Sequence, residues 1–187
     1  MIHLVVGRQG SGKTLFLVNK ALFFHTKHKT IYANFKLNFP TAVLTYDDII
    51  NCNLKNGGVF LDEVHLLLPA REWYKPHCKK ICDGFLSQVR KQNLELYCTT
   101  QMLRKVDVRL REEADFIYEC EKFIYDNGSW NLCTETDENI KHKPIVIKVN
   151  VTETYSQKST FIFFHANKLY SKYDTRQIIK IVGLEDD

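Results

Sequence analysis

The chain has 187 residues, of which 44% are hydrophobic and 26% are charged, and this composition is typical of one ordinary globular domain with a core. Its apolar runs are far shorter than the roughly 20 residues needed to cross a bilayer, so we expect no membrane span of its own and a cytoplasmic protein. The net charge of +4 permits a polyanionic partner but cannot establish one. The six cysteines lack zinc-site spacing, so we expect reduced thiols.

Apolar strands and segments of helical periodicity alternate along residues 1 to about 120. The first strand is expected at Met1–Val6, and the following helix begins at Gly12 and buries Leu15, Val18 and Leu22. The next expected elements are a strand at Thr30–Asn34, a short helix from Asp47-Asp48 to about Cys52 that ends at Gly57-Gly58, a buried strand at Val59–Leu61, a helix that buries Ile81, Phe85 and Val89, and a strand at Leu94–Thr100. This alternation predicts a doubly wound α/β fold with a mostly parallel sheet.

The rest of the chain, about 121–187, is expected to extend the same sheet with further β-strands. No linker, repeat or low-complexity tract interrupts it, so we expect one domain over residues 1–187. Asp126-Asn127-Gly128 is a strong turn signal, and the polar stretch Thr134–Lys143 is expected to be a loop. The expected strands are Phe116–Tyr118, Lys122–Tyr125, Ile145–Val151 and Thr160–Phe164.

A phosphate-binding motif follows the first expected strand. Gly7-Arg8-Gln9-Gly10-Ser11-Gly12-Lys13-Thr14 matches G-x-x-x-x-G-K-[ST] at every fixed position and precedes a helix, which is the context a P-loop requires. Glycines let successive backbone N–H groups turn toward phosphate oxygens, and the helix N-terminus adds positive potential. The expected nucleotide-binding residues are Gly7, Arg8, Gln9, Gly10, Ser11, Gly12, Lys13, Thr14 and Leu15, with Lys13 also placing its charge on the β- and γ-phosphates.

Two adjacent carboxylates favour nucleotide hydrolysis among the reactions that a P-loop can support. Asp62 and Glu63 end the apolar strand Val59–Leu61, as a Walker B pair does. We expect Asp62 and the Thr14 hydroxyl to hold Mg²⁺, and Glu63 to deprotonate the attacking water. This arrangement is similar to the additional-strand, catalytic-glutamate class of P-loop ATPases, in which another strand separates the P-loop and Walker B strands. An ordinary strand-end turn is the alternative for Asp62 and Glu63.

Further catalytic candidates are a strand-end glutamine and several arginines. Gln101 follows the strand Leu94–Thr100, where this class places a sensor of the γ-phosphate, although a solvated strand end is the alternative. Arg90 should point away from the buried helical stripe, as suits an arginine finger that reaches a neighbouring subunit's nucleotide. Arg109 and Arg111 are rivals for that role, and a solvated surface charge is an equally good interpretation of each of these arginines.

The nucleotide is expected to be ATP. The sequence has no N-K-x-D segment of the kind that gives small GTPases their specificity. A small-molecule kinase usually has an arginine-rich lid, which Arg104, Arg109 and Arg111 could form, so a kinase or a nucleotide switch stays as a remote alternative.

Several segments resemble the ATPase domain of the zonular occludens toxin family, which includes the assembly ATPases of filamentous phages and is similar to the FtsK/HerA group and to viral genome-packaging ATPases. The resemblance implies a homo-oligomeric ring, expected to contain six subunits, with active sites between subunits. It also implies a polynucleotide or a phage filament as the cargo. The matching segments, all within residues 1 to about 120, are Asp62-Glu63-Val64-His65, Pro69–Trp73, Gln88–Leu96, Thr100-Gln101, Asp107–Arg111 and Ala114–Ile117.

Two motor functions compete. The filamentous-phage proteins carry a transmembrane helix and a further domain after the ATPase domain, and this sequence encodes neither. That departure favours a viral or mobile-element ATPase that packages or translocates double-stranded DNA, in the host cytoplasm if the protein is viral. The alternative is a virion assembly or extrusion ATPase whose cargo is a coat protein.

Overall fold

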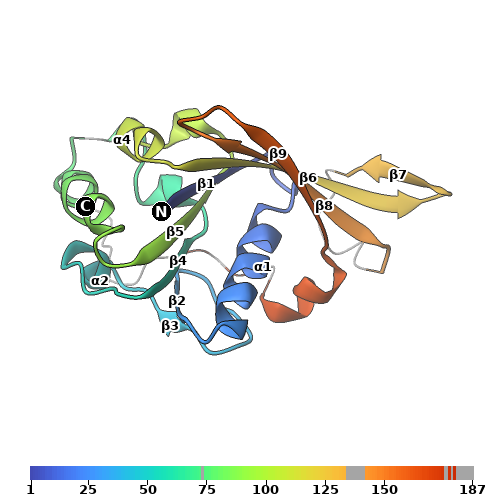
Figure 1. Ribbon diagram of the computed structural model, residues 1–187, viewed down its shortest axis with the longest axis horizontal. Helices are drawn as coiled ribbons and strands as arrows, with labels where there is room; N and C mark the ends of the chain where they lie inside the picture. Colours follow the sequence, from blue (N-terminus) through green and yellow to red (C-terminus); the bar gives the residue numbers. More distant parts are fainter. Residues whose placement is uncertain (73, 134–141, 175–176, 178, 180–187) are drawn as a thin grey trace.

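A single sheet organises the computed structural model, which describes residues 1–72, 74–133, 142–174, 177 and 179 (Figure 1). Eight of its nine strands lie in the order β3-β2-β4-β5-β1-β6-β8-β9, and the ninth, β7, pairs with β6. The strands are β1 Ile2–Val6, β2 Thr30–Ala33, β3 Ala42–Val43, β4 Gly57–Leu61, β5 Leu94–Thr100, β6 Phe116–Asp126, β7 Ser129–Leu132, β8 Ile145–Glu153 and β9 Ser159–His165. The pairs from β3 to β6 are parallel, and β7, β8 and β9 join antiparallel.

The strand order confirms the predicted α/β fold and its additional strand. Strand β5 lies between β1, which leads into the P-loop motif, and β4, which leads into Asp62 and Glu63. Because both strands run parallel to β5, their carboxyl ends meet at one edge of the sheet. Strand β6 pairs with β1 on one side and with β8 on the other, so the C-terminal strands continue the same sheet. On this continuity we propose that residues 1–187 form one domain.

Helices cover both faces of the sheet and create two hydrophobic cores (Figure 1). Helix α1 (Lys13–Thr26) and the 3₁₀ helix Asn167–Lys172 pack on one face, where β8 contributes Ile145, Ile147 and Val149. The other face carries α2 (Tyr46–Ile50), α3 (Pro76–Lys80), the π-helix Ile81–Leu86 and α4 (Val108–Glu112), with short 3₁₀ turns at Val64–Leu66 and Leu103–Lys105. No described helix has the length and apolar character of a membrane span.

The boundaries differ from expectation in three places. Gly57 and Gly58 do not end the preceding segment but begin β4. Glycine is needed at position 57 because a Cβ there would lie 2.4 Å from the Thr30 carbonyl oxygen of the neighbouring strand. The helical stripe Ile81, Phe85 and Val89 is buried as predicted, yet Ile81–Leu86 adopts a π-helix. The two strands expected at 116–118 and 122–125 form one strand, β6. Most of the expected loop at 134–143 lies outside the described residues.

The predicted turn at Asp126-Asn127-Gly128 closes a β-hairpin. Asn127 and Gly128 have φ values of 50° and 80°, and Asp126 pairs with Ser129 across the turn. Positive φ at both central residues matches the twist of the flanking strands, which is why Asn-Gly is favoured here. The resulting β6–β7 hairpin projects from the body of the molecule (Figure 1).

Candidate functional site

The P-loop motif forms the connection between β1 and α1. Gly7, Gly10 and Gly12 have φ values of 153°, 76° and 92°, a region that L side chains rarely enter. Space also requires glycine at Gly12, since a Cβ there would lie 2.4 Å from Cδ1 of Ile147 on β8. The loop therefore turns as the motif predicts, and strand β8 packs directly against its last glycine.

The remaining motif residues lie around this turn in different environments. Arg8 and Gln9 are exposed, whereas Ser11 is buried and its Oγ has no hydrogen-bond partner among the described residues. Lys13 is also buried, and its Nζ donates a hydrogen bond of 3.1 Å to the Arg8 carbonyl across the loop. The Leu15 side chain belongs to the hydrophobic core, so this residue can offer a ligand only its backbone N–H.

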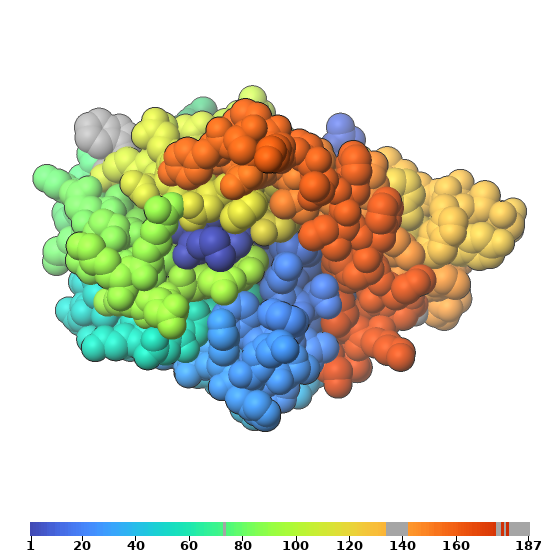
Figure 2. Space-filling view, viewed as in Figure 1, coloured from blue at the N-terminus to red at the C-terminus, as the bar shows by residue number. Residues whose placement is uncertain are grey.

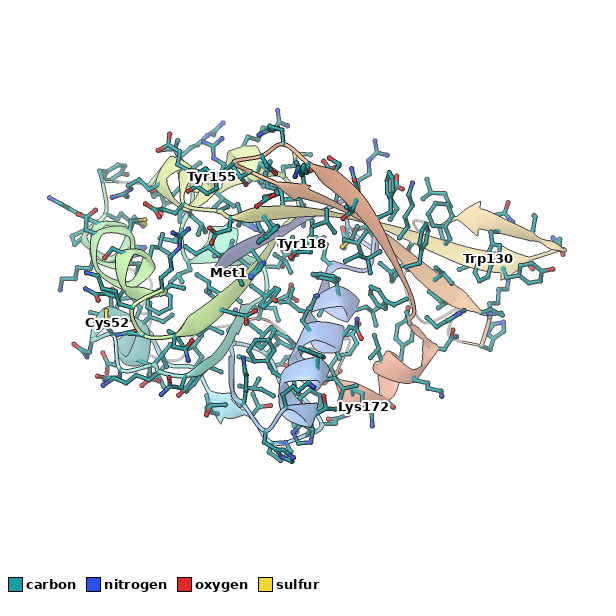
Figure 3. The ribbon with its side chains drawn as sticks, viewed as in Figure 1. Met1, Cys52, Tyr118, Trp130, Tyr155 and Lys172 are labelled. Atoms are coloured by element: carbon teal, nitrogen blue, oxygen red, sulfur yellow. The ribbon has the colours of Figure 1, made fainter. Side chains whose placement is uncertain are left out.

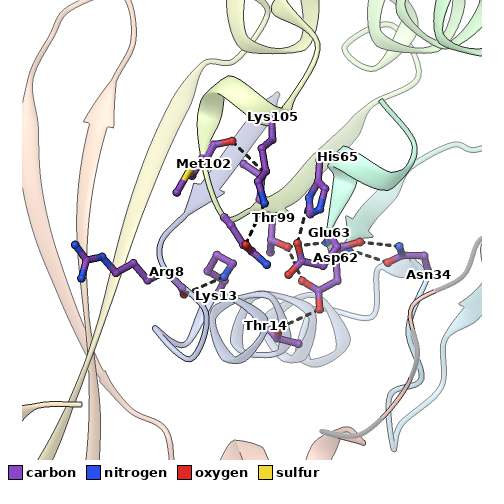
Figure 4. Close-up of polar contacts among 12 residues, drawn as sticks. Arg8, Lys13, Thr14, Asn34, Asp62, Glu63, His65, Thr99, Met102 and Lys105 are labelled. Atoms are coloured by element: carbon purple, nitrogen blue, oxygen red, sulfur yellow. Dashed lines mark hydrogen bonds and ion pairs between the residues drawn. The ribbon is translucent and has the colours of Figure 1, made fainter. Parts of the chain in front are cut away.

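Thr14 and Asp62 meet at the carboxyl edge of the sheet (Figure 4). The Thr14 hydroxyl donates a hydrogen bond of 2.9 Å to Oδ2 of Asp62, and the Thr99 hydroxyl donates to the other carboxylate oxygen. A hydroxyl and a carboxylate are hard oxygen donors of the kind that Mg²⁺ prefers, in combination with phosphate oxygens. The chemistry of the pair thus fits a Mg²⁺ ion bound with a nucleotide, while the metal site itself stays a prediction.

Asn34 holds the backbone of Asp62 in place. Its Oδ1 accepts a hydrogen bond of 2.8 Å from the Asp62 N–H, and its Nδ2 donates one of 2.9 Å to the Asp62 carbonyl. Asn34 follows β2, which pairs with β4, so the contact depends on strand pairing rather than on sequence proximity. Sequence reasoning missed both Asn34 and Thr99, although Thr99 stands at the polar end of a predicted strand.

Glu63 has an unusual backbone conformation and a histidine neighbour. Its φ and ψ are 52° and 50°, in the left-handed region, and its N–H donates a 2.8 Å hydrogen bond to the Thr99 hydroxyl. This conformation is uncommon for residues other than glycine and costs about 1–3 kcal/mol, so the surrounding contacts must impose it. The Glu63 Oε2 lies 3.2 Å from Nδ1 of His65 (Figure 4), a contact that the sequence did not predict.

Gln101 stands beside the start of the phosphate loop. Thr100 pairs with Val6 in the β1–β5 register, so the residues that follow them, Gln101 and Gly7, leave the sheet side by side. The Gln101 Oε1 accepts a hydrogen bond of 3.2 Å from Nζ of Lys105. The strand pairing therefore brings Gln101 to the same edge as Lys13 and Glu63, while its role as a sensor stays a prediction.

Comparison with known proteins identifies the family. A family model for zonular occludens toxin (Zot) matches residues 42–168, which is more than half of the chain. The chain belongs to the Zot family. No curated protein matches this sequence. The matched range contains Asp62, Glu63, Arg90 and Gln101 but not the P-loop, whose assignment depends on its own motif and geometry.

Solved structures show the same fold at low sequence identity. The N-terminal domain of zonular occludens toxin from Neisseria meningitidis has a TM-score of 0.56 at 18% identity, over 92% of this chain and 98% of that chain. The genome packaging NTPase B204 from Sulfolobus turreted icosahedral virus 2, solved in complex with ATP-gammaS, has a TM-score of 0.52 at 14% identity, over 86% of this chain and 95% of that chain. This Zot-family chain therefore has a P-loop NTPase fold.

Arg90 of this Zot-family chain lies far from its own phosphate loop. Its guanidinium pairs with Asp115, whose Oδ2 accepts a 2.8 Å hydrogen bond from the N–H of Ile2. Ile2 begins β1 and Gly7 follows its end, so Arg90 stands at the opposite edge of the sheet from the P-loop. Figures 2 and 3 view this edge, with the blue N-terminus and Met1 near its centre and Tyr155 nearby. Arg90 therefore does not reach the phosphate loop of its own chain, and a role as an arginine finger toward a neighbouring subunit stays a prediction.

The rival arginines differ in how firmly they are held. Arg109 donates from Nε and Nη2 to the buried carboxylate of Asp107 at 3.1 and 2.9 Å, and its Nη1 lies 3.5 Å from Asp83. Arg104 is exposed, whereas Nε of Arg111 is buried without a hydrogen-bond partner in the described chain. The bidentate contact gives Arg109 a structural function, which weakens its case as a finger or as part of a mobile lid.

Asp107→Asn should lower the free energy of unfolding by about 1–3 kcal/mol, because Asp107 caps α4 and its carboxylate accepts charge-assisted hydrogen bonds from Arg109. These hydrogen bonds hold the pKa of Asp107 below its usual value. The carboxylate therefore stabilises the fold above the pKa it has in the unfolded chain, and this contribution disappears as pH falls through the lower folded pKa. Urea unfolding of both proteins between pH 7 and pH 3 measures it.

The matched control for this prediction is Asp83→Asn. Asp83 reaches the same guanidinium from an exposed position, so its removal should cost less than about 0.5 kcal/mol. Equal losses in the two variants, or a difference between wild type and Asp107→Asn that does not shrink toward acid pH, would contradict the structural assignment of Asp107.

Proposed function

We propose that the chain is a Mg²⁺-dependent ATP hydrolase. The observation that carries this proposal is the hydrogen bond between Thr14 and Asp62 beside the P-loop, with Glu63 as the next residue. Thr14 and Asp62 would hold Mg²⁺, which when bound supplies positive charge that offsets charge on the phosphates during transfer. The buried hydroxyl of Ser11 and the glycine conformations of the loop fit a phosphate ligand.

Each side chain at this edge has a distinct task in the proposed reaction. Lys13, which donates to the Arg8 carbonyl in this structure, would turn its amine to the β- and γ-phosphate oxygens. Glu63 would accept the proton of the attacking water at its carboxylate. Gln101, beside the phosphate loop, would contact the γ-phosphate and report its loss through β5. The Thr99 hydroxyl accepts a hydrogen bond from the Glu63 N–H, and the His65 ring lies beside the Glu63 carboxylate.

We further propose that hydrolysis drives a cytoplasmic ring of identical subunits along double-stranded DNA. The support is the fold shared with the genome packaging NTPase B204 and with the DNA-packaging ATPase B204 from Sulfolobus turreted icosahedral virus, together with a net charge of +4. Arg90, at the edge remote from its own P-loop, could complete the site of a neighbour. Membership of the Zot family favours a second candidate, an assembly ATPase that acts on a coat protein.

Double-stranded DNA should stimulate ATP hydrolysis several-fold, and the stimulation should fall steeply between about 50 and 200 mM salt, because phosphate contacts release counterions when they form. The measurement is steady-state phosphate release at several salt concentrations, with and without DNA. A rate of phosphate release that is unchanged by DNA at every salt concentration would contradict the DNA motor. It would be compatible with the motor that acts on a protein cargo. No hydrolysis either with or without DNA would contradict the ATP hydrolase proposal itself.

A further inference from the structure

A cavity beside the phosphate loop extends from the proposed phosphate site to strands that have no role in the chemistry described so far. Its volume is about 530 Å³, within the range of small-molecule sites. One wall is the P-loop, through Gly7, Arg8, Gln9 and Ser11, and the other walls come from β6, β7, β8 and β9. The cavity is therefore continuous with the proposed phosphate site and is built from the C-terminal strands.

Strand register explains why these distant strands reach the loop. Val6, the last residue of β1, pairs with Glu119 of β6, which pairs with Asn150 of β8, which in turn pairs with Phe161 of β9. The four residues form one row across the sheet, and the phosphate loop starts at the end of that row. The last β6 partner of β1 is Glu119, and the Lys122 carbonyl accepts a hydrogen bond from the Cys133 N–H, so only the short stretch of β6 between them has its edge open toward the loop.

The cavity contains a hydrogen-bond acceptor that lacks a donor. Nδ2 of Asn150 donates 3.2 Å to Oε2 of Glu119, which fixes the orientation of the amide. Oδ1 of Asn150 is then buried without a partner among the described residues. A buried acceptor without a donor costs about 1–3 kcal/mol, so a ligand that donates a hydrogen bond there would bind favourably.

The same cavity has an exposed aromatic and aliphatic rim. Phe161 is 61% exposed and Leu132 is 62% exposed, although both are large apolar side chains. Nζ of Lys148 lies 5.2 Å from the centre of the Phe161 ring and 3.4 Å from Oε2 of Glu121. A flat ligand that stacks on Phe161 would cover this apolar surface, in the way that aromatic side chains bind nucleobases.

The glycine turn indicates which part of a nucleotide enters the cavity. The cavity lining carries charges of both signs, Arg8, Lys122 and Lys148 with Glu119 and Glu121, so charge alone does not select the group that binds. The triphosphate would occupy the glycine turn beside Lys13 and the Thr14–Asp62 pair, which leaves the cavity to the rest of the nucleotide. We propose that the cavity binds the nucleobase of the nucleotide, a purine with an exocyclic amino group that stacks on Phe161 and donates to Asn150. This inference rests on the proposed ATP hydrolase function.

Calorimetric titrations with ATP, with tripolyphosphate and with purine riboside triphosphate, which lacks the exocyclic amine, test the assignment. Phe161→Ala and Asn150→Ala should each weaken ATP binding about 10-fold, since stacking and a donated hydrogen bond are lost, while tripolyphosphate binding stays unchanged. Wild type should bind ATP more tightly than purine riboside triphosphate, and Asn150→Ala should abolish that preference. Phe161→Trp should keep the wild-type affinity.

Phe163→Ala is the matched control. Phe163 lies two residues further along β9, is 63% exposed and does not line the cavity, so its removal should leave ATP affinity unchanged. If Phe161→Ala and Asn150→Ala bind ATP as wild type does, the nucleobase site is wrong and the hydrolase proposal stands. If wild type binds neither ATP nor tripolyphosphate, the hydrolase proposal fails and the nucleobase site fails with it.

Discussion

Glu63→Gln should reduce the rate of ATP hydrolysis about 10²–10⁴-fold, the usual contribution of a general base, while ATP still binds. Glutamine has nearly the same shape as glutamate but cannot accept the proton of the attacking water. The backbone of Glu63 is fixed by its hydrogen bond to Thr99, so the substitution should not disturb Asp62 or the loop. The variant should therefore accumulate as an ATP complex.

Single-turnover hydrolysis and nucleotide retention on the isolated protein measure the two halves of this prediction. The control is Glu113→Gln, an exposed position after α4, which should hydrolyse ATP at the wild-type rate. Wild-type hydrolysis by Glu63→Gln would show that another group activates the water. Loss of ATP binding in this variant would mean that Glu63 contributes to the nucleotide site itself.

Lys13→Ala should abolish measurable ATP binding, with a loss of affinity of about 100-fold or more, because a buried ammonium that pairs with phosphate oxygens makes strong charge-assisted hydrogen bonds. Tripolyphosphate binding should fall by a similar factor, since in the proposed complex Lys13 would contact only the phosphate groups. Equilibrium binding of a fluorescent ATP analogue measures the affinity, and thermal unfolding without nucleotide checks that the variant is folded.

Lys27→Ala provides the comparison for Lys13→Ala. Lys27 is an exposed lysine immediately after α1, so its loss removes the same charge from the chain without reaching the phosphate loop. Its ATP affinity should match that of wild type. Retained ATP binding in Lys13→Ala would contradict the P-loop assignment, and a parallel loss in Lys27→Ala would point to a general effect of net charge.

The fold was predictable from the sequence where the local residue pattern alone identifies the element. Buried strands such as β4 and β5 are rich in apolar residues, and the P-loop motif is expected only between a strand and a helix. Strand β6 was expected as two pieces because Glu119 and Glu121 interrupt the apolar residues, although both lie on the exposed face of one continuous strand. The π-helix at Ile81–Leu86 was also missed, since the buried stripe has the same spacing in an α-helix.

The candidate site was predictable only for residues that belong to local motifs. Thr14, Asp62 and Glu63 follow from spacing along the chain, and the structure brings them to one edge of the sheet. Asn34 and Asn150 could not be found in this way, because their contacts depend on which strands pair and in which register. For the same reason the sequence gives no sign that β9 reaches the phosphate loop.

The contact between Gly12 and Ile147 ties the phosphate loop to a strand more than a hundred residues away in the sequence. Side chains on a strand alternate between faces, so a slip of β8 by one residue would replace Ile147 by Val146 or Lys148 at this contact. A lysine there would bring a charged side chain against Gly12, and a valine would leave a gap. A one-residue insertion or deletion within β8 would therefore bring the wrong side chain to Gly12.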